Sequence, residues 1–241
     1  MEKQTVLITG ANKGIGLETA RQLATAGYYV YLGSRDQDRG QKAVDELKAE
    51  GLNDIELLLI DVTSEQSVQK AHDELAAKID HLDVLINNAG IPGAFPQPAA
   101  ATSDDTMKQV FEVNFFGVIR TVRIFIDLVK KSPNPRIVNV TSDLGSLAYH
   151  NDPAWQYYHF KSAAYGPSKT ALNAYTVALA FDLKDQVKVN MVNPGYTNTE
   201  FNGNQGPKAV EDGAAPIVEY AMLDADGPTG KYVSDYGETP W

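Results

Sequence analysis

The stretch Thr9-Gly10-Ala11-Asn12-Lys13-Gly14-Ile15-Gly16 decides the fold, because it joins a short apolar run to a longer segment with helical periodicity. Glycines let a backbone turn tightly and approach a pyrophosphate, while the free amides of a helix N-terminus stabilise negative charge. A glycine triplet alone is weak evidence, since ordinary tight turns use the same residues. Its position between a strand and a helix predicts a dinucleotide-binding loop. We expect the cofactor contacts of this loop to come from Gly10, Asn12, Lys13, Gly14, Ile15 and Gly16.

The chain on either side alternates short apolar segments with longer amphipathic ones. Continuous β-branched runs separated by helices are typical of a parallel sheet covered on both faces. We therefore predict a single doubly wound α/β domain that spans residues 1–241. Strands are predicted at 5–9, 28–33, 55–60, 84–87, 136–141, 188–192 and 231–234. Helices are predicted at about 14–26, 37–50, 64–78, 104–131, 163–184 and 209–223.

Composition restricts the partners of this chain. Its 241 residues suit one large domain, and 21 basic against 31 acidic side chains give a formal charge of -10. This charge argues against nucleic acid or an anionic membrane as the main partner, so we expect a small molecule. No cysteine is present, which excludes disulfides and thiolate catalysis. The four histidines lack metal-ligand spacing, and we predict no metal site.

Neither a secretory signal nor a membrane span is evident in the sequence. The apolar run Val6-Leu7-Ile8 is too short for the core of a signal peptide, and it leads directly into the glycine motif. The longest aliphatic run, Leu57-Leu58-Leu59-Ile60, is far shorter than a membrane-spanning helix requires. We therefore expect a cytoplasmic protein.

Two tyrosines are each followed four residues later by a lysine, and the pairs are Tyr157/Lys161 and Tyr165/Lys169. On a helix these positions share one face, so the ammonium group can favour the ionised form of the phenol. Residues 168–180 have apolar side chains at helical spacing and no proline, so Tyr165 opens a long helix. Tyr157 lies in an aromatic run that we interpret as a loop or substrate wall. We predict Tyr165/Lys169 as the acid–base pair, and the other pair stays the alternative.

The glycine spacing is Gly-x-x-x-Gly-x-Gly, which differs from the Gly-x-Gly-x-x-Gly of the common dinucleotide fingerprint. Together with Tyr165/Lys169, this spacing resembles the short-chain dehydrogenase/reductase family. Within the family, Asn12-Lys13-Gly14-Ile15-Gly16 and Arg35-Asp36 with Arg39-Gly40 resemble the carbonyl-reductase branch. The resemblance extends over nearly the whole chain and implies a Rossmann-type fold, whose seven-stranded parallel sheet has the order 3-2-1-4-5-6-7. The other matching motifs, in chain order, are Asp61, Asn87-Asn88-Ala89-Gly90, Asn114, Ser142 and Pro194-Gly195.

By this resemblance, Asn114, Ser142, Tyr165 and Lys169 form the catalytic set of a carbonyl-reducing enzyme. Hydride addition to a carbonyl carbon leaves negative charge on oxygen, so the site needs a hydrogen-bond donor and a proton source. Ser142 can polarise the carbonyl and Tyr165 can deliver the proton, while Lys169 and a cationic nicotinamide are expected to lower the phenol pKa. Asn114 is expected to position a water beside the lysine, or to be an ordinary core amide. Ser146 competes weakly with Ser142, which ends the predicted strand directly.

Charge near the adenine ribose decides which nicotinamide cofactor is used. Arg35 lies 19 residues beyond Gly16, at about the distance expected for a ribose contact, and Lys13 lies inside the glycine loop. A guanidinium grips phosphate oxygens in a fork and an ammonium adds a point charge, so we predict NADP(H). The neighbouring Asp36 could compete for Arg35. The resemblance adds Asp61, Val62, Asn88, Ala89, Gly90, Tyr165, Lys169, Pro194, Gly195, Thr197 and Thr199 as cofactor contacts.

Two segments are expected to form the substrate site. Tyr165 follows Ser142 by 23 positions, a longer spacing than the family commonly has, which indicates an insertion at about 146–163. This insertion is rich in aromatic residues and is expected to wall an apolar pocket. The loop at about 196–208 is expected to form part of the substrate site, and its Phe201–Pro207 stretch is expected to be a mobile substrate lid or a plain surface loop. Because the branch links such an insertion to a monomer, the choice between monomer and homo-oligomer stays open.

The function that follows is NADPH-dependent reduction of apolar ketones or aldehydes to alcohols. Two alternatives stay open. An NAD-linked secondary-alcohol dehydrogenase would use the same residues with a different cofactor preference. A non-catalytic NADP-sensing regulator would bind the nucleotide without turnover, and retention of all four catalytic residue types counts against it.

Overall fold

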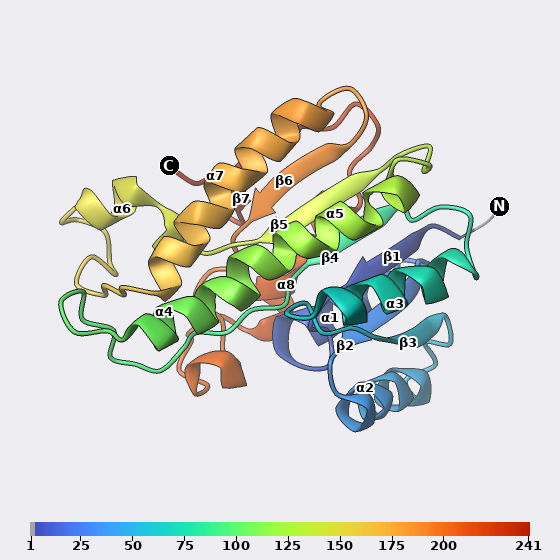
Figure 1. Cartoon of the computed structure of the whole chain (residues 1–241), viewed down its shortest axis with the longest axis horizontal. Helices are drawn as coiled ribbons and strands as arrows, with labels where there is room; N and C mark the ends of the chain where they lie inside the picture. The colour runs from blue at the N-terminus through green and yellow to red at the C-terminus, as the bar shows by residue number, and fades with distance from the viewer. Residues whose placement is uncertain (1–2) are drawn as a thin grey trace.

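A twisted sheet forms the centre of the molecule, and helices cover both of its faces (Figure 1). The computed structural model describes residues 3–241. Within these residues the strand order is β3-β2-β1-β4-β5-β6-β7-β8, and the first seven strands run parallel. The predicted doubly wound α/β fold and its order 3-2-1-4-5-6-7 are therefore confirmed. The strands are β1 (Thr5–Ile8), β2 (Tyr29–Ser34), β3 (Ile55–Leu59), β4 (Val84–Asn87), β5 (Arg136–Val140), β6 (Lys188–Val192), β7 (Tyr232–Ser234) and β8 (Gly237–Glu238).

The helices follow the predicted positions to within a few residues, with two differences. The helix predicted at 104–131 is interrupted by a π-helical turn at Glu112–Phe116, where hydrogen bonds span one residue more than in an α-helix. A short helix, α6, forms inside the insertion. Among residues 3–241 no helix is both long and apolar enough to cross a membrane. The helices are α1 (Gly14–Thr25), α2 (Gln37–Ala49), α3 (Glu65–Ala76), α4 (Asp104–Phe111), α5 (Gly117–Val129), α6 (Leu147–Asn151), α7 (Tyr165–Leu183) and α8 (Val210–Ala221).

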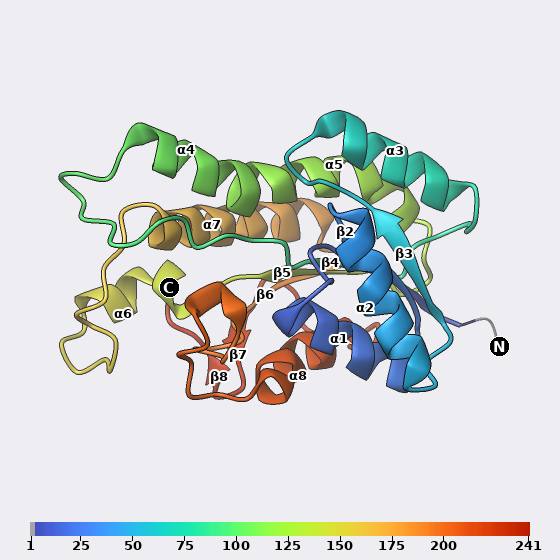
Figure 2. The ribbon, with the colours of Figure 1, turned by 90° about the horizontal axis from the view of Figure 1, so that it is seen from below.

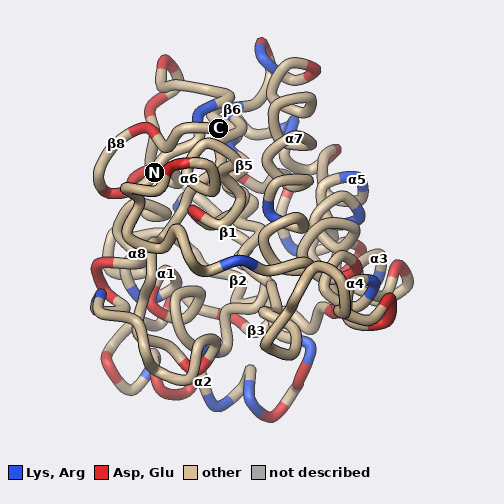
Figure 3. Tube along the Cα trace, turned by 90° about the vertical axis from the view of Figure 1, so that its left-hand side faces the viewer, with Lys and Arg blue, Asp and Glu red and all other residues tan. Residues whose placement is uncertain are grey.

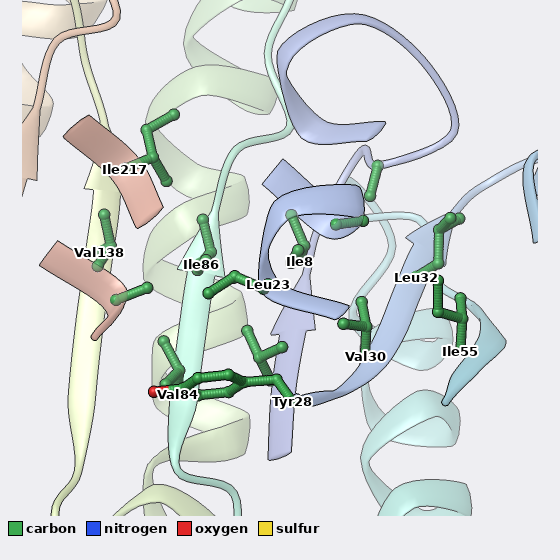
Figure 4. Packing of buried hydrophobic residues seen from close by; sticks show 14 of the residues in the cluster. Ile8, Leu23, Tyr28, Val30, Leu32, Ile55, Val84, Ile86, Val138 and Ile217 are labelled. Atoms are coloured by element: carbon green, nitrogen blue, oxygen red, sulfur yellow. The ribbon is translucent and has the colours of Figure 1, made fainter. Parts of the chain in front are cut away.

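Alternate side chains of the strands enter two separate cores. On one face Ile8 packs in a cluster with Leu23 of α1 and Ile217 of α8 (Figure 4). On the other face Leu7 belongs to a cluster with Phe125 of α5. Figure 2 shows α1, α2 and α8 on one side of the sheet and α3, α5 and α7 on the other. Because both faces are buried, the strands appear in the sequence as continuous apolar runs.

The structure adds one strand to the seven that were predicted. This strand, β8, pairs antiparallel with β7, with Val233 opposite Glu238 and Ser234 opposite Gly237. Gly237 has a φ of +103°, a left-handed value that favours glycine and lets the chain reverse there. A two-residue strand carries no alternation of apolar and polar side chains, which is why no pattern in the sequence indicates it.

The order of the strands reverses at the centre of the sheet, because β1 pairs with β2 on one side and with β4 on the other. In an open parallel sheet this places a ligand-binding crevice at the carboxyl ends of the strands. The glycine loop follows β1, Asn88-Ala89-Gly90 follows β4, and Ser142 follows β5. The predicted motifs therefore lie at one edge of the sheet. Acidic and basic residues are interspersed over the surrounding helices and loops (Figure 3).

Candidate active site

The glycine loop lies between β1 and the N-terminus of α1, against the loop that follows β4. Gly14 has a φ of +56°, and a Cβ atom on Gly16 would lie 2.4 Å from the side-chain nitrogen of Asn88. Asn88 in turn donates from Nδ2 to the carbonyl oxygens of Thr9 at 2.9 Å and Gly10 at 3.1 Å. Positions 14 and 16 therefore need glycine, and the loop is held firmly against the neighbouring strand end.

The N-terminus of α1 is suited to an anion. Among the described residues no side chain caps this helix, and its first turn contains no acidic residue. The amides of that turn and the positive end of the helix dipole stabilise negative charge. Lys13, the N-cap residue, adds a cation, and Asn12 and Ile15 are partly buried in the same loop. The loop therefore fits the pyrophosphate of a dinucleotide.

Tyr165, Lys169 and Ser142 lie together between the carboxyl end of β5 and the first turn of α7. Tyr165 begins α7, and one turn later the Lys169 ammonium nitrogen lies 5.9 Å from the centre of the Tyr165 ring. The Ser142 side chain is within hydrogen-bonding range of the phenol. Lys169 is buried and donates to the backbone carbonyl of Val140 at 2.9 Å. The fold thus brings three of the predicted catalytic side chains together.

Burial controls the acidity of this pair. It raises the pKa of Tyr165 to about 12, and the hydrogen bond with Ser142 only partly opposes the shift. Burial also lowers the pKa of Lys169 to about 8. The expected lowering of the phenol pKa by the lysine is not found in the protein chain alone. The ammonium group donates to the carbonyl of Val140 and not to the phenol. The loss of hydration on burial therefore determines the direction of the phenol pKa.

The alternative pair, Tyr157 and Lys161, lies between α6 and α7, and its two members have different neighbours. Lys161 lies over the ring of Tyr158, 4.2 Å from its centre, and donates to the carbonyl of His150 at 2.9 Å. Tyr157 packs edge-on against Tyr196, with ring centres 5.7 Å apart. This geometry is typical of a wall residue and a structural lysine, and it favours the pair on α7.

Asn114 and Ser146 are both engaged by the protein itself. Asn114 lies fully buried in the π-helical turn, where its side chain accepts from the Ile91 amide at 2.8 Å. Its Nδ2 donates to the Ile91 carbonyl at 3.0 Å and to Ser168 Oγ at 3.1 Å, so this satisfied core amide joins the loop after β4 to α7. Ser146 is also fully buried and caps α6 through its hydroxyl. Ser142 is only partly buried, so it is the serine that can reach a ligand.

The residues predicted for the adenine ribose lie at the carboxyl end of β2. Arg35 follows that strand and is exposed. Asp36, the predicted competitor, caps α2, where its carboxylate accepts from the backbone amide and the Nε of Arg39, each at 2.9 Å. These bonds hold the pKa of Asp36 below its usual range. The carboxylate is thus held by Arg39 and not by Arg35.

Lys13 makes a contact that the sequence does not indicate. Its ammonium nitrogen lies 2.8 Å from Oε2 of Glu200, in the short 3₁₀ helix Glu200–Asn202 with which the predicted lid begins. Both side chains are exposed, and a pocket lined by Lys13, Gly14, Thr199 and Glu200 lies between the glycine loop and the lid. The partners are 187 positions apart, so no local pattern could reveal the pair. Glu200 would compete with a phosphate for this lysine.

Several predicted contact residues shape the crevice through bonds within their own loops. The buried hydroxyl of Thr197 donates to the carbonyls of Pro194 at 3.1 Å and Gly195 at 3.2 Å, which closes the turn after β6. Asp61 accepts from the amide of Thr63 at 3.0 Å and from its hydroxyl at 2.8 Å. The remaining predicted contacts also have close neighbours in the protein. Val62 lies beside Gly117, Ala89 beside Gly10, Gly90 beside Lys169, and Thr199 beside Gly14.

Aromatic rings from three loops gather beside the predicted catalytic residues. Phe201, from the predicted lid, packs edge-on against Tyr165 with ring centres 5.7 Å apart. Phe95, from the loop after β4, packs on Phe160 of the insertion at 5.5 Å. The sequence does not single out Phe95 or Phe201, because their loops carry no periodic pattern. The insertion thus contacts the loop after β4, and the lid contacts Tyr165.

The chain is similar to known proteins in sequence and in fold. The family model described as short chain dehydrogenase matches residues 4–209. The chain is 36% identical over 240 residues to the short-chain dehydrogenase anuI of Penicillium roqueforti (strain FM164), with 97% of this chain and 94% of the relative covered. It is 31% identical over 283 residues to carbonyl reductase (NADPH) 1 of Mus musculus, with 99% of each covered. The structure of salutaridine reductase from Papaver somniferum matches with a TM-score of 0.84 at 28% identity, covering 95% of this chain and 98% of that one. The chain therefore belongs to the short-chain dehydrogenase/reductase family of oxidoreductases.

Proposed function

We propose that this oxidoreductase reduces apolar ketones and aldehydes to alcohols with NADPH. One observation carries the proposal: a phenol, a serine hydroxyl and a buried ammonium group, from Tyr165, Ser142 and Lys169, lie together at the carboxyl edge of the sheet. The Phe201 ring packed against Tyr165 and the aromatic residues of the insertion suit an apolar substrate. The relative named carbonyl reductase (NADPH) 1 supports the same reaction and cofactor.

The residues divide the chemistry between them. A bound nicotinamide cofactor would supply the hydride to the carbonyl carbon. Ser142 would donate a hydrogen bond to the carbonyl oxygen, where negative charge develops, and Tyr165 would donate its proton to the same oxygen. With a pKa of about 12, the phenol is protonated at neutral pH, which is the state that reduction requires. Lys169 would stabilise the phenolate that remains and hold the cofactor ribose.

The charges at the adenine end support NADPH over NADH. Arg35 is exposed at the end of β2, and Lys13 lies at the N-terminus of α1. An enzyme that uses NAD usually offers a carboxylate to the ribose 2′-hydroxyl near this point. The nearest acid, Asp36, is bound by Arg39. Two cations and an engaged acid are therefore better suited to a 2′-phosphate than to a hydroxyl.

Turnover by the purified protein tests the proposal. NADPH oxidation is followed at its absorbance band with a panel of aryl ketones and quinones. Wild-type protein should consume NADPH with several of them, and Tyr165→Phe should lower kcat by at least ~100-fold because the proton donor is lost. Tyr157→Phe should mainly change KM. The opposite pattern would reverse the assignment of the two tyrosines.

The same assay separates the alternatives. NADPH binding without turnover of any carbonyl would indicate a non-catalytic sensor, and faster turnover with NADH than with NADPH would indicate an NAD-linked dehydrogenase. Arg35→Asp should shift the preference towards NADH, because it replaces a phosphate-binding cation with an acid that can hold the ribose. Lys131→Asp, an equal charge change at an exposed position after α5, is the control and should not shift it.

A further inference from the structure

Asp143, the residue directly after Ser142, is held by two distant segments. It begins the 3₁₀ turn Asp143–Gly145. Its Oδ1 atom accepts a hydrogen bond from Asn193 Nδ2 at 2.5 Å and another from the hydroxyl of Tyr236. Asn193 follows β6, and Tyr236 lies in the turn between β7 and β8. Two donors on one oxygen are the bonds expected of a carboxylate, and they fix its direction.

The charge of Asp143 is not neutralised within the described chain. Of residues 3–241, no lysine or arginine lies within ion-pair distance of Asp143, and no hydrogen bond reaches its Oδ2 atom. Lys208 acts on it only from farther away, since its ammonium group pairs with Asp235 at 2.8 Å. Burial raises the pKa of the Asp143 carboxyl group, as expected for a charge with too little hydration. A bound cation would therefore be stabilised here.

Aromatic rings lie near this carboxylate. Trp155 packs edge-on against His150, whose Nε2 lies 3.0 Å from the carbonyl oxygen of Leu144, the residue after Asp143. Tyr196 lies three residues beyond Asn193, which binds Asp143. Tyr157 packs edge-on against Tyr196 at 5.7 Å and against Trp155 at 5.6 Å between ring centres. Aromatic faces attract cations, most strongly where water is partly excluded. A carboxylate in a turn bordered by such rings, directly after Ser142, has the features of a binding site for an organic cation.

We propose that Asp143 and these rings select carbonyl substrates that carry a protonated amine. The inference rests on the proposed function, because the ammonium-binding group belongs to the same substrate pocket. Ser142 and Tyr165 act on the carbonyl oxygen, and the Oδ2 atom of Asp143 accepts a charge-assisted hydrogen bond from the ammonium group of the same molecule. Asn193 and Tyr236 are positioning residues, since they act through Asp143.

Two ketones of nearly equal shape test this inference. 4-(Dimethylaminomethyl)acetophenone is protonated on its amine at neutral pH, whereas 4-isobutylacetophenone is its neutral isostere. The measured quantity is the ratio of their kcat/KM values with NADPH. We expect the wild-type ratio to favour the amine, and Asp143→Asn to lower the ratio roughly tenfold or more, as for the loss of one charge-assisted hydrogen bond. Turnover of the neutral ketone should change little, because Asn keeps the Oδ1 acceptor.

Asp185→Asn is the matched control. It removes the same charge from the exposed turn between α7 and β6, at the opposite edge of the sheet, and should leave the ratio unchanged.

A second measurement uses only the wild-type enzyme, so its outcome does not depend on whether a variant folds. With wild-type enzyme, N,N-dimethylbenzylamine should compete with the neutral ketone, and isobutylbenzene should compete much more weakly.

The possible failures are distinguishable. A wild-type ratio that does not favour the amine, or an equal loss for both ketones in Asp143→Asn, would overturn the inference and make Asp143 a structural residue only. Equal inhibition by the two compounds that lack a carbonyl would overturn it as well. If wild-type protein binds NADPH but turns over neither ketone, the proposed function itself is wrong and the inference falls with it.

Discussion

Tyr165 shows how burial decides the acid–base state of this site. A phenol beside an ammonium group is predicted to be acidic, but burial raises the Tyr165 pKa to about 12 and lowers the Lys169 pKa to about 8. Both shifts favour the neutral form of the side chain. A neutral phenol can donate a proton but not accept one. The protein chain by itself therefore holds Tyr165 in the protonated state that the proposed carbonyl reduction requires.

The rate of carbonyl reduction should fall as the pH rises through about 8, the pKa of Lys169. Below this pH the lysine is charged and stabilises the phenolate left after proton transfer, whereas above it the charge is lost. Tyr165 keeps its proton up to about 12, so the decline belongs to the lysine. The measurement is kcat/KM for a neutral ketone across about pH 6 to 10. Lys169→Met should be slower and lack this inflection, and a wild-type profile without it would contradict the role of the lysine charge.

The short helix Glu200–Asn202 connects the two halves of the site. Glu200 pairs with Lys13, and Phe201 packs on Tyr165. This short helix therefore contacts both the glycine loop and the proposed proton donor. Any movement of this element would change both contacts at once.

Glu200→Gln should tighten NADPH binding about two- to fivefold, because it releases Lys13 for the 2′-phosphate. The expected gain in NADPH affinity is small, because the Lys13–Glu200 ion pair is exposed to water and therefore weak. Quenching of protein fluorescence measures the affinity for NADPH and for NADH. Glu219→Gln, on the exposed side of α8, removes the same charge and should change neither value. Equal tightening for both cofactors would argue against a contact between Lys13 and the phosphate.

The sheet as a whole creates the site, because its parallel strands deliver every functional loop to one edge. The proposed cofactor contacts follow β1, β2, β3, β4 and β6, and the proposed catalytic residues follow β5 or lie on helices that pack on the sheet. No single segment holds the site. Loss of the sheet would therefore separate all of these groups.

NADPH should stabilise the entire domain against unfolding, since it would bind several strand ends of the folded chain and none of the unfolded chain. At ~100 times its Kd, the free energy of unfolding should rise by about 2.7 kcal/mol. For a protein of this size that corresponds to roughly 5–11 °C in Tm. Thermal unfolding followed by circular dichroism measures the shift. NADH at the same concentration should give a smaller one, and an equal or larger shift with NADH would contradict the roles of Arg35 and Lys13.

Local patterns in the sequence determined most of the fold and supplied the candidate site residues. Short apolar runs mark seven of the strands, and helical spacing after Tyr165 shows which tyrosine begins a long helix. The glycine loop is marked by its place between a strand and a helix. Side-chain periods of two and of 3.6 residues are properties of short segments, so they can be recognised before the tertiary structure is known.

Tertiary structure alone decided the features that depend on distant partners. The Lys13–Glu200 pair and the anchoring of Asp143 by Asn193 and Tyr236 join residues from separate ends of the chain. The pKa directions of the catalytic pair follow from burial, which inverts the acidity that the sequence predicts for the phenol. Burial and long-range contacts depend on which segments the fold brings together. The spacing of neighbouring residues contains no information about either, because it reports only on local conformation.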